Sequence, residues 1–433
     1  MSIIMSFGVK RKIIGVVIIV VIFIFLGSLL VFDRPQDPDL IAYKVQTNQV
    51  FEDAKIEFER LRGVTLPSDI TLSVYTKQQA IDKWGKPASN LDIENILRQE
   101  NIYKSLFLMT ENESLSNAST EWVASWTAVT VNNEIYVIYE NFWPWDIPNA
   151  KAILIHELTH VWQPAIPSPT NYDSDQAQNA LLEGDASYMA NYYYSTEYNK
   201  NISNSSNSKI SYNTSLPAFL YLPKWDGISP NVPNAVYNLN WFPYIQGETF
   251  VSAIVDNYGW SRLNLCYTTP AYTPSTTEQI LHPNKYFTGE TAKPPLAPTP
   301  PDDSWTIIPS RYGYPSDTYG EYFIYIMLNQ WLDDNQAQKA ATGWGGDNFT
   351  YYEKDADFLF TWNINWDSIK DASEFNQAFT DMLKLTQATP NGNNQWLTNN
   401  NRYLTLFWNP STATTLIICS TNQAATNHAF FTQ

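Results

Sequence analysis

The hydrophobic and polar positions along the chain predict a protein built mostly from helices. Helical patterns cover residues 40–62, 77–84, 93–108, 149–163, 177–194, 241–257, 317–332 and 371–385. Strand-like segments are fewer and cover residues 64–74, 127–139 and 361–366. Asn132 and Asn133 interrupt the middle strand segment, which is typical of a hairpin turn. The pattern therefore predicts an α+β fold that is predominantly helical with a small sheet, and the sequence contains no internal repeat.

The most hydrophobic stretch of the chain is residues 13–32, a run without charge that follows three basic residues at 10–12. Its length suffices to cross a bilayer, and the basic flank favours a cytoplasmic N-terminus. The run ends in LLVFDRPQD, which lacks the small-residue exit of a signal peptide, so an uncleaved anchor is favoured over a cleaved signal. The expected organisation is a cytoplasmic basic segment 1–12, this transmembrane anchor, a linker 33–39 and an extracytoplasmic domain 40–433 with a helical C-terminal part.

The predicted helix at 149–163 carries the motif His156-Glu157-Leu158-Thr159-His160. Residues four apart lie on the same face of a helix, so the two histidines can present their imidazoles to one metal ion. Glu157 lies about 100° further round the helix, where it can hold a water molecule but is badly placed as a third ligand. This is the zincin arrangement, in which zinc is a Lewis acid and the glutamate is the general base.

A third zinc ligand is expected on the next predicted helix, which contains both Glu183 and Asp185. The two positions are about 200° apart, so only one of them can face the metal. Glu183 shares its face with small residues that allow a close approach to the histidine helix, and Gly184 indicates such a contact. Glu183 is therefore the expected ligand, with Asp185 as the competitor. Asp185 is expected instead to hydrogen-bond a ligand or a helix end around the site.

Two further predictions concern the surroundings of the metal. The hairpin at 127–139 is a candidate for the strand that pairs with an extended substrate, with an ordinary core hairpin as the alternative. The developing oxyanion needs a donor besides zinc. His282 is one of two histidines outside the motif and is the candidate for this catalytic role, with Tyr286 or a tyrosine from 188–194 as rivals.

Charge and covalent features agree with export. The net charge is −17 and there is no basic patch, which argues against nucleic acid as a partner and against attraction to anionic lipid. The only two cysteines, Cys266 and Cys419, are expected to form one disulfide outside the cell, with two buried thiols as the alternative. Six Asn-x-Ser/Thr acceptors suggest glycosylation, at Asn112, Asn117, Asn201, Asn204, Asn213 and Asn348.

A series of motifs, in order along the chain, resembles a largely uncharacterised family of exported prokaryotic proteins. The motifs are HELTHVWQ, ALLEGDASYMA, PYIQGETFV with YGW, TTEQILHPNKY, YGEYF and GWGGDNF with Trp-Asp at 366–367. The resemblance covers roughly residues 40–385, and the family is similar to the gluzincin branch of the metallopeptidases.

This resemblance implies a zincin fold with zinc on His156, His160 and Glu183, and with Glu157 as the base. In thermolysin-like gluzincins an aspartate follows the ligand glutamate by four residues. Ser187 stands at that position here, so the residues that surround the ligands are expected to differ, and with them the role of Asp185.

The expected function is that of a membrane-anchored extracytoplasmic zinc hydrolase, most simply a metallopeptidase that acts on peptides or proteins. One alternative is an inactive surface binding protein in which zinc is a scaffold. The intact Glu157 argues against it, because a scaffold needs only the ligands. The other alternative is a zinc hydrolase of non-peptide amides in the cell envelope, which the same site chemistry would serve.

Overall fold

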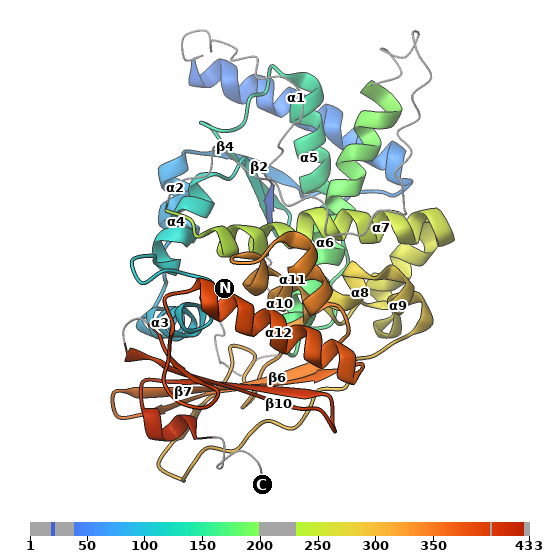
Figure 1. Ribbon diagram of the computed structural model, residues 1–433. Coiled ribbons are helices and arrows are strands. Elements are labelled where there is room, and N and C mark those ends of the chain that lie inside the picture. The colour runs from blue at the N-terminus through green and yellow to red at the C-terminus, as the bar shows by residue number, and fades with distance from the viewer. Residues whose placement is uncertain (1–18, 22–38, 199–230, 399–400, 428–433) are drawn as a thin grey trace.

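The computed structural model consists of two blocks of secondary structure, each built on one sheet, and helices from both halves of the sequence share a buried core between them (Figure 1). It describes residues 19–21, 39–198, 231–398 and 401–427. A small sheet and several helices form the first block, and a seven-stranded sheet with covering helices forms the second. This confirms the α+β class, but the second sheet is larger than the sequence predicts.

The small sheet has the strand order β1-β3-β4-β2. Its strands are β1 (Ile19–Val21), β2 (Thr71–Tyr75), β3 (Ala128–Val131) and β4 (Glu134–Ile138). The predicted hairpin is confirmed, because β3 and β4 pair antiparallel and Asn132 adopts a left-handed φ of 56° at the turn. Strand β2 adds parallel to β4, and β1 adds antiparallel to β3.

Six helices surround this sheet or lead away from it. They are α1 (Leu40–Arg62), α2 (Lys77–Trp84), α3 (Asn90–Ser105), α4 (Leu115–Ala124), α5 (Ile147–Trp162) and α6 (Tyr172–Tyr193). Helix α1 begins where the Asp39 side chain accepts a hydrogen bond from the Ile41 backbone, and it ends at Gly63, whose φ is 71°. The predicted helices at 40–62 and 77–84 are confirmed. Helices α1 and α5 share a buried core with β3 and β4.

The long helix α7 (Asn234–Thr268) crosses α6 at two glycines. A Cβ atom placed on Gly184 would lie 2.2 Å from the backbone carbonyl of Gly247, and one placed on Gly247 would lie 2.1 Å from the oxygen of Ala180. The two backbones therefore touch. Gly184 does mark a close helix contact, but its partner is α7 and not the histidine helix that the sequence suggested. Gly259, with φ 74° and ψ 175°, interrupts the helical conformation of α7 near the predicted helix end at 257.

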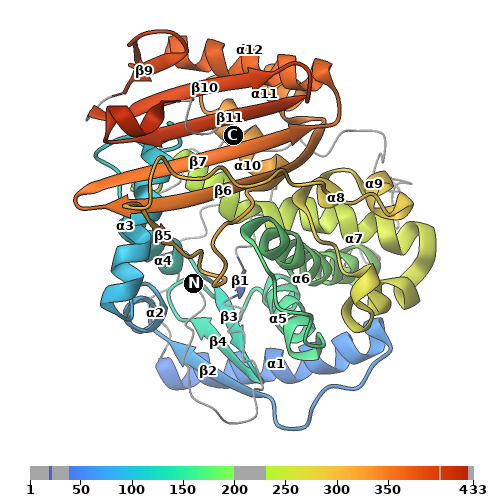
Figure 2. The ribbon, with the colours of Figure 1, turned by 90° about the horizontal axis from the view of Figure 1, so that it is seen from below.

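The C-terminal block is a sheet of order β5-β6-β7-β11-β10-β9-β8. Figure 2 shows β10, β11, β7 and β6 side by side, and Figure 1 shows α10 and α12 on the face toward the N-terminal block. The strands are β5 (Thr306–Ile308), β6 (Trp344–Lys354), β7 (Asp357–Trp366), β8 (Thr389–Pro390), β9 (Gln395–Leu397), β10 (Tyr403–Asn409) and β11 (Thr414–Ser420). The remaining helices are α8 (Thr277–Leu281), α9 (Pro283–Thr288), α10 (Gly320–Asn329), α11 (Asp334–Ala341) and α12 (Ile369–Leu385).

A buried carboxylate joins α10 to this sheet. The Asp347 side chain accepts hydrogen bonds from the backbone nitrogens of Tyr319 and Gly320 and from the indole nitrogens of Trp344 and Trp362. A carboxylate that accepts four donors at the start of a helix is well satisfied although it is fully buried.

The structure also overturns one covalent prediction. Cys266 in α7 and Cys419 in β11 are both buried free thiols, so the expected disulfide is not formed. The Cys266 sulfur lies 3.3 Å from the Tyr286 hydroxyl, which gives it a partner other than cysteine.

Of the predicted anchor at 13–32, the structure describes only Ile19–Val21, and the rest lies outside the described residues. Within the described part of the chain, no helix has the length and hydrophobicity to span a membrane. Three of the six glycosylation acceptors, at 201, 204 and 213, likewise fall outside the described residues.

Candidate metal centre

Helix α5 places the two histidines. Pro148 stands in its first turn, and the helix ends at Trp162, shortly before Pro164. Its central residues are all buried, because one side faces the small sheet and α1 while another faces α6. The side chains of His156 and His160 are each only 1% exposed. Two imidazoles are therefore held together in the interior.

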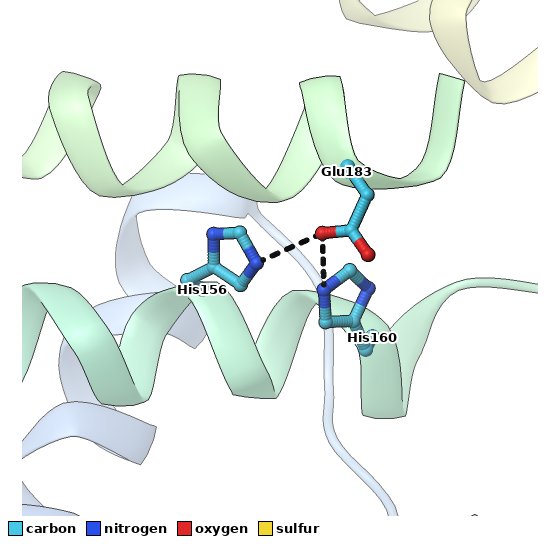
Figure 3. Close-up of side chains that lie close together, drawn as sticks. All are labelled: His156, His160 and Glu183. Atoms are coloured by element: carbon cyan, nitrogen blue, oxygen red, sulfur yellow. Dashed lines mark hydrogen bonds and ion pairs between the residues drawn. The ribbon is translucent and has the colours of Figure 1, made fainter. Parts of the chain in front are cut away.

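Helix α6 brings Glu183 to the same point, as the sequence predicts (Figure 3). Its Oε2 atom lies 3.3 Å from Nε2 of His156 and 3.5 Å from Nε2 of His160. Gly184 follows Glu183 directly, and its close contact with the backbone of α7 holds α6 in place next to the glutamate. Asp185 points elsewhere, as the helical geometry predicts.

The donor set and its spacing fit a zinc ion. Two imidazole nitrogens and one carboxylate oxygen form the ligand set of one class of catalytic zinc site. Around a tetrahedral zinc with bonds of about 2.0–2.1 Å, neighbouring ligand atoms lie about 3.3 Å apart. The two nitrogen–oxygen separations, 3.3 and 3.5 Å, match that value. Nε2 of His160 is buried and makes no hydrogen bond within the described part of the chain. The group can hold a metal ion.

The protonation of His156 and Glu183 agrees with this use. Burial lowers the pKa of His156 to about 4, so its ring is neutral at pH 7. Burial alone would raise the pKa of Glu183, but the charge of His160 and the hydrogen bond from His156 outweigh it and the pKa is lowered. Burial alone would lower the pKa of His160, but the charge of Glu183 outweighs burial and the pKa is raised, so a metal ion has to displace a proton from this ring. An ionised carboxylate and neutral imidazoles are the forms that bind metal.

Glu157 lies beside this group without belonging to it. It is fully buried, and burial raises its pKa to about 8. Its Oε2 atom accepts a hydrogen bond from the Thr130 hydroxyl of β3 at 2.5 Å. Its Oε1 atom is buried and has no hydrogen-bond partner among the residues that the structure describes. One carboxylate oxygen is thus held and the other is left for a ligand.

Gln163 orients His160, and the sequence analysis did not identify it. Its amide nitrogen donates to the backbone oxygen of Leu182 at 2.8 Å, which directs its amide oxygen toward Nδ1 of His160, also at 2.8 Å. An amide oxygen can only accept, so Nδ1 carries the proton and Nε2 presents its lone pair to the metal position. The position three residues after a ligand histidine on the same helix was the only signal in the sequence.

Asp185 acts at a greater distance than the sequence suggested. It forms a buried ion pair with Arg62 of α1, at 2.5 and 3.0 Å, and accepts a hydrogen bond from the Tyr267 hydroxyl at 2.7 Å. The same hydroxyl accepts from the amide of Gln163 at 3.2 Å. Among the described residues, Asp185 is therefore linked to His160 through Tyr267 and Gln163. The Arg62 guanidinium also lies over two indole rings, those of Trp162 and Trp260, each at 4.3 Å.

His282 is not part of the converging group. It lies between α8 and α9, and its Nε2 atom is 2.9 Å from the buried carboxylate of Glu321. The rival Tyr286 donates its hydroxyl to the backbone oxygen of Tyr272 at 2.7 Å. The aromatic ring that does stack on a ligand is Tyr244 of α7, with its centroid 6.2 Å from that of His156 and the planes 17° apart.

A second acidic group differs from this site. Glu278, Glu290 and Asp367 come close together, but the ammonium of Lys285 lies between them at 2.7, 2.9 and 3.1 Å. The lysine already neutralises these carboxylates, and no histidine joins them.

Comparison with known proteins adds little to this picture. Residues 310–429 match a family described as a domain of unknown function, DUF8575, and this stretch excludes the metal group. The chain matches no curated protein. A crystal structure of a protein from Chloroflexus aurantiacus, described as a putative hydrolase with a novel fold, matches at 15% identity over 58% of this chain and 92% of that one, with a TM-score of 0.32. Similarity at that level carries no argument, so the functional conclusion depends on the site itself.

Proposed function

We propose that this protein is a zinc-dependent hydrolase with a gluzincin-type site and that it acts on peptides or proteins. The observation that supports this most strongly is the convergence of His156, His160 and Glu183 at the spacing of tetrahedral ligands. Glu157 strengthens it, because one of its oxygens stays without a hydrogen-bond partner among the described residues beside that group.

In the proposed reaction a bound zinc ion supplies a Lewis acid for the substrate carbonyl and lowers the pKa of water. Glu157 is the general base. Its Oε1 atom takes a proton from the attacking water and afterwards delivers it to the leaving amine. A residue that both accepts and donates a proton works best with a pKa near the working pH, and burial moves the pKa of Glu157 in that direction, to about 8.

The oxyanion that forms on the carbonyl requires a hydrogen-bond donor. We propose Tyr244 as the candidate for this role, because its ring stacks on His156 and a phenol hydroxyl can donate. His282, the candidate from the sequence, is engaged instead by the carboxylate of Glu321.

A peptide substrate is favoured over other amides by the position of β3. Thr130 of this strand contacts Glu157, so β3 borders the site. The outer edge of β3 pairs antiparallel with Ile19–Val21, which is how an extended peptide would bind there. A peptide that used this edge would have to replace those three residues.

The cellular location remains a prediction from the sequence. We propose that residues 13–32 anchor the chain in a membrane with the acidic domain outside the cytoplasm, which requires Ile19–Val21 to leave the edge of β3 with which they pair in the structure. Membrane fractionation followed by protease treatment of intact cells tests this, and a chain that stays in the soluble fraction and resists protease would contradict it.

The experiment that tests the activity is cleavage of a peptide library by the full chain loaded with zinc, beside the variant Glu157→Gln. The amide removes the base but leaves the three ligands intact. We expect cleavage by the native protein and a loss of about 10²–10⁴-fold in the variant. A zinc-loaded variant as active as the native protein would refute the catalytic role. Zinc binding without any hydrolysis of peptides or other amides would favour the scaffold alternative.

A further inference from the structure

Thr130 is a polar side chain on an otherwise apolar face. Successive residues of a strand point to opposite sides of the sheet, so Ala128 and Thr130 share one face of β3. That face packs against α5, because Ala128 and the neighbouring Ile135 belong to the same core cluster as residues of that helix. Ile135 is also the residue paired with Thr130 across the hairpin. The Thr130 side chain is only 4% exposed.

A buried hydroxyl needs a hydrogen-bond partner, and two acceptor oxygens of Glu157 lie within reach of the Thr130 hydroxyl. Its distance to Oε2 of Glu157 is 2.5 Å, and its distance to the backbone oxygen of Glu157 is 3.2 Å. A hydroxyl has only one proton to donate, so the shorter contact, to the carboxyl oxygen, is the stronger one. The bond joins two residues that are 27 positions apart in sequence.

This bond restrains the plane of the Glu157 carboxylate and leaves its second oxygen available for chemistry. With Oε2 held by the strand, Oε1 is the atom left without a hydrogen-bond partner in the described part of the chain. Without the hydroxyl, the carboxylate plane could turn away from this orientation, because the last side-chain torsion of a glutamate is broad. A general base must lie within hydrogen-bond reach of the proton that it takes.

We propose that Thr130 is the positioning residue of the general base, and that it holds the Glu157 carboxylate in the one orientation that presents Oε1 to the attacking water. This inference rests on the proposed hydrolase function. The ligands come from the two helices α5 and α6, and Thr130 makes the small sheet a part of the site as well. Substrate bound along β3 would lie on the same strand that holds the base.

The matched variants are Thr130→Val and Thr130→Ser. Valine keeps the volume and branching of the side chain but removes the hydroxyl, while serine keeps the hydroxyl. Thr47→Val is the control, since Thr47 is also a buried threonine, and its hydroxyl donates only to the Tyr43 backbone oxygen of α1 at 2.8 Å. Each variant is made in the full chain, and zinc content, kcat and KM toward a cleaved peptide are measured.

For Thr130→Val we expect one zinc per chain as in the native protein, an unchanged KM and a kcat lowered by about 10–100-fold. Thr130→Ser should recover kcat to within about threefold of the native value, and Thr47→Val should match the native protein in all three measurements. An unchanged kcat in Thr130→Val would overturn the proposal. So would a loss of zinc, or an equal loss of activity in Thr130→Ser, because either would indicate a merely structural role.

A failure of the positioning role of Thr130 can be distinguished from a failure of the proposed hydrolase function. If the native protein cleaves and Glu157→Gln does not, the base is confirmed whatever Thr130→Val does. If the native protein does not cleave any substrate, the proposed function fails before the threonine is tested.

Discussion

The crossing of α6 and α7 makes a quantitative prediction for Gly184→Ala. A Cβ atom at this position would lie 2.2 Å from the carbonyl carbon and oxygen of Gly247 and 2.7 Å from its Cα atom. All three contacts are backbone atoms, so no side chain can rotate away. The helices would have to separate by about an ångström before the contact became acceptable.

Two opposing free-energy terms decide the sign of the effect. Alanine is favoured over glycine in a helix interior by about 1 kcal/mol. Overpacking a rigid contact costs about 1–3 kcal/mol and occasionally more. Because the clash is between two backbones, we expect the cost to lie at the upper end, which leaves a net destabilisation of about 2 kcal/mol. Glu183 is the adjacent residue, so zinc affinity should also fall, by about 10–100-fold.

The assay is urea denaturation of the metal-free protein, followed by zinc titration against a chelator of known affinity. Asn179→Ala, at a half-buried position of the same helix, is the control for helix propensity and should not destabilise the protein. If Gly184→Ala were as stable as the native protein and bound zinc equally well, the close crossing would not be what positions the third ligand.

Three other predictions follow from the surroundings of the metal. Gln163→Ala should lower zinc affinity by about 10–100-fold in a chelator competition, because His160 loses the acceptor that fixes its tautomer, and an unchanged affinity would contradict this. Arg62→Met should lower the free energy of unfolding by about 3–5 kcal/mol in urea, because Asp185 is left buried without its cation, whereas replacing both partners with apolar residues should restore most of the loss. Burial raises the pKa of Glu157 to about 8, so this carboxyl is mostly protonated at pH 7 in the metal-free protein. A zinc ion bound beside Glu157 favours its ionised form. Zinc binding at pH 7 should therefore release protons, and Glu157→Gln should release about one fewer when calorimetry is compared in buffers of different ionisation enthalpy; equal release would refute the assignment.

The metal group was largely predictable from the sequence because its geometry is local. Two histidines four apart on a helix must share a face, and Glu183 was separated from Asp185 by their angular positions on the next helix. The structure brings His156, His160 and Glu183 together as expected. Gly184 also pointed to a close helix contact, and the structure shows one, although with α7 and not with the histidine helix.

The residues that support the group were not predictable because their partners are distant in sequence. Asp185 pairs with Arg62, which lies 123 positions earlier, and no local pattern connects the two. In the sequence Thr130 is one residue of an apolar strand, and its contact with Glu157 depends on the packing of β3 against α5. The orientation of Gln163 depends on a backbone oxygen of the neighbouring helix.

The large sheet was missed for a different reason. Glycines at 343, 345 and 346 stand where β6 begins, and the register of β6 against β7 shifts between Trp344 and Gly346. Glycine in a strand often marks such an irregularity. Strands β10 and β11 follow the helix that the sequence analysis took as the last element, and their threonines and asparagines weaken the hydrophobic alternation.

The most direct test of the metal site is zinc content and anomalous scattering at the zinc absorption edge for the native protein and for Glu183→Ala. We predict one zinc per chain, located between the Nε2 atoms of His156 and His160 and the Glu183 carboxylate. In Glu183→Ala the affinity should fall by several orders of magnitude, since one of three protein ligands is lost. A native protein that binds no zinc, or a Glu183→Ala variant with full zinc content and unchanged affinity, would contradict the account.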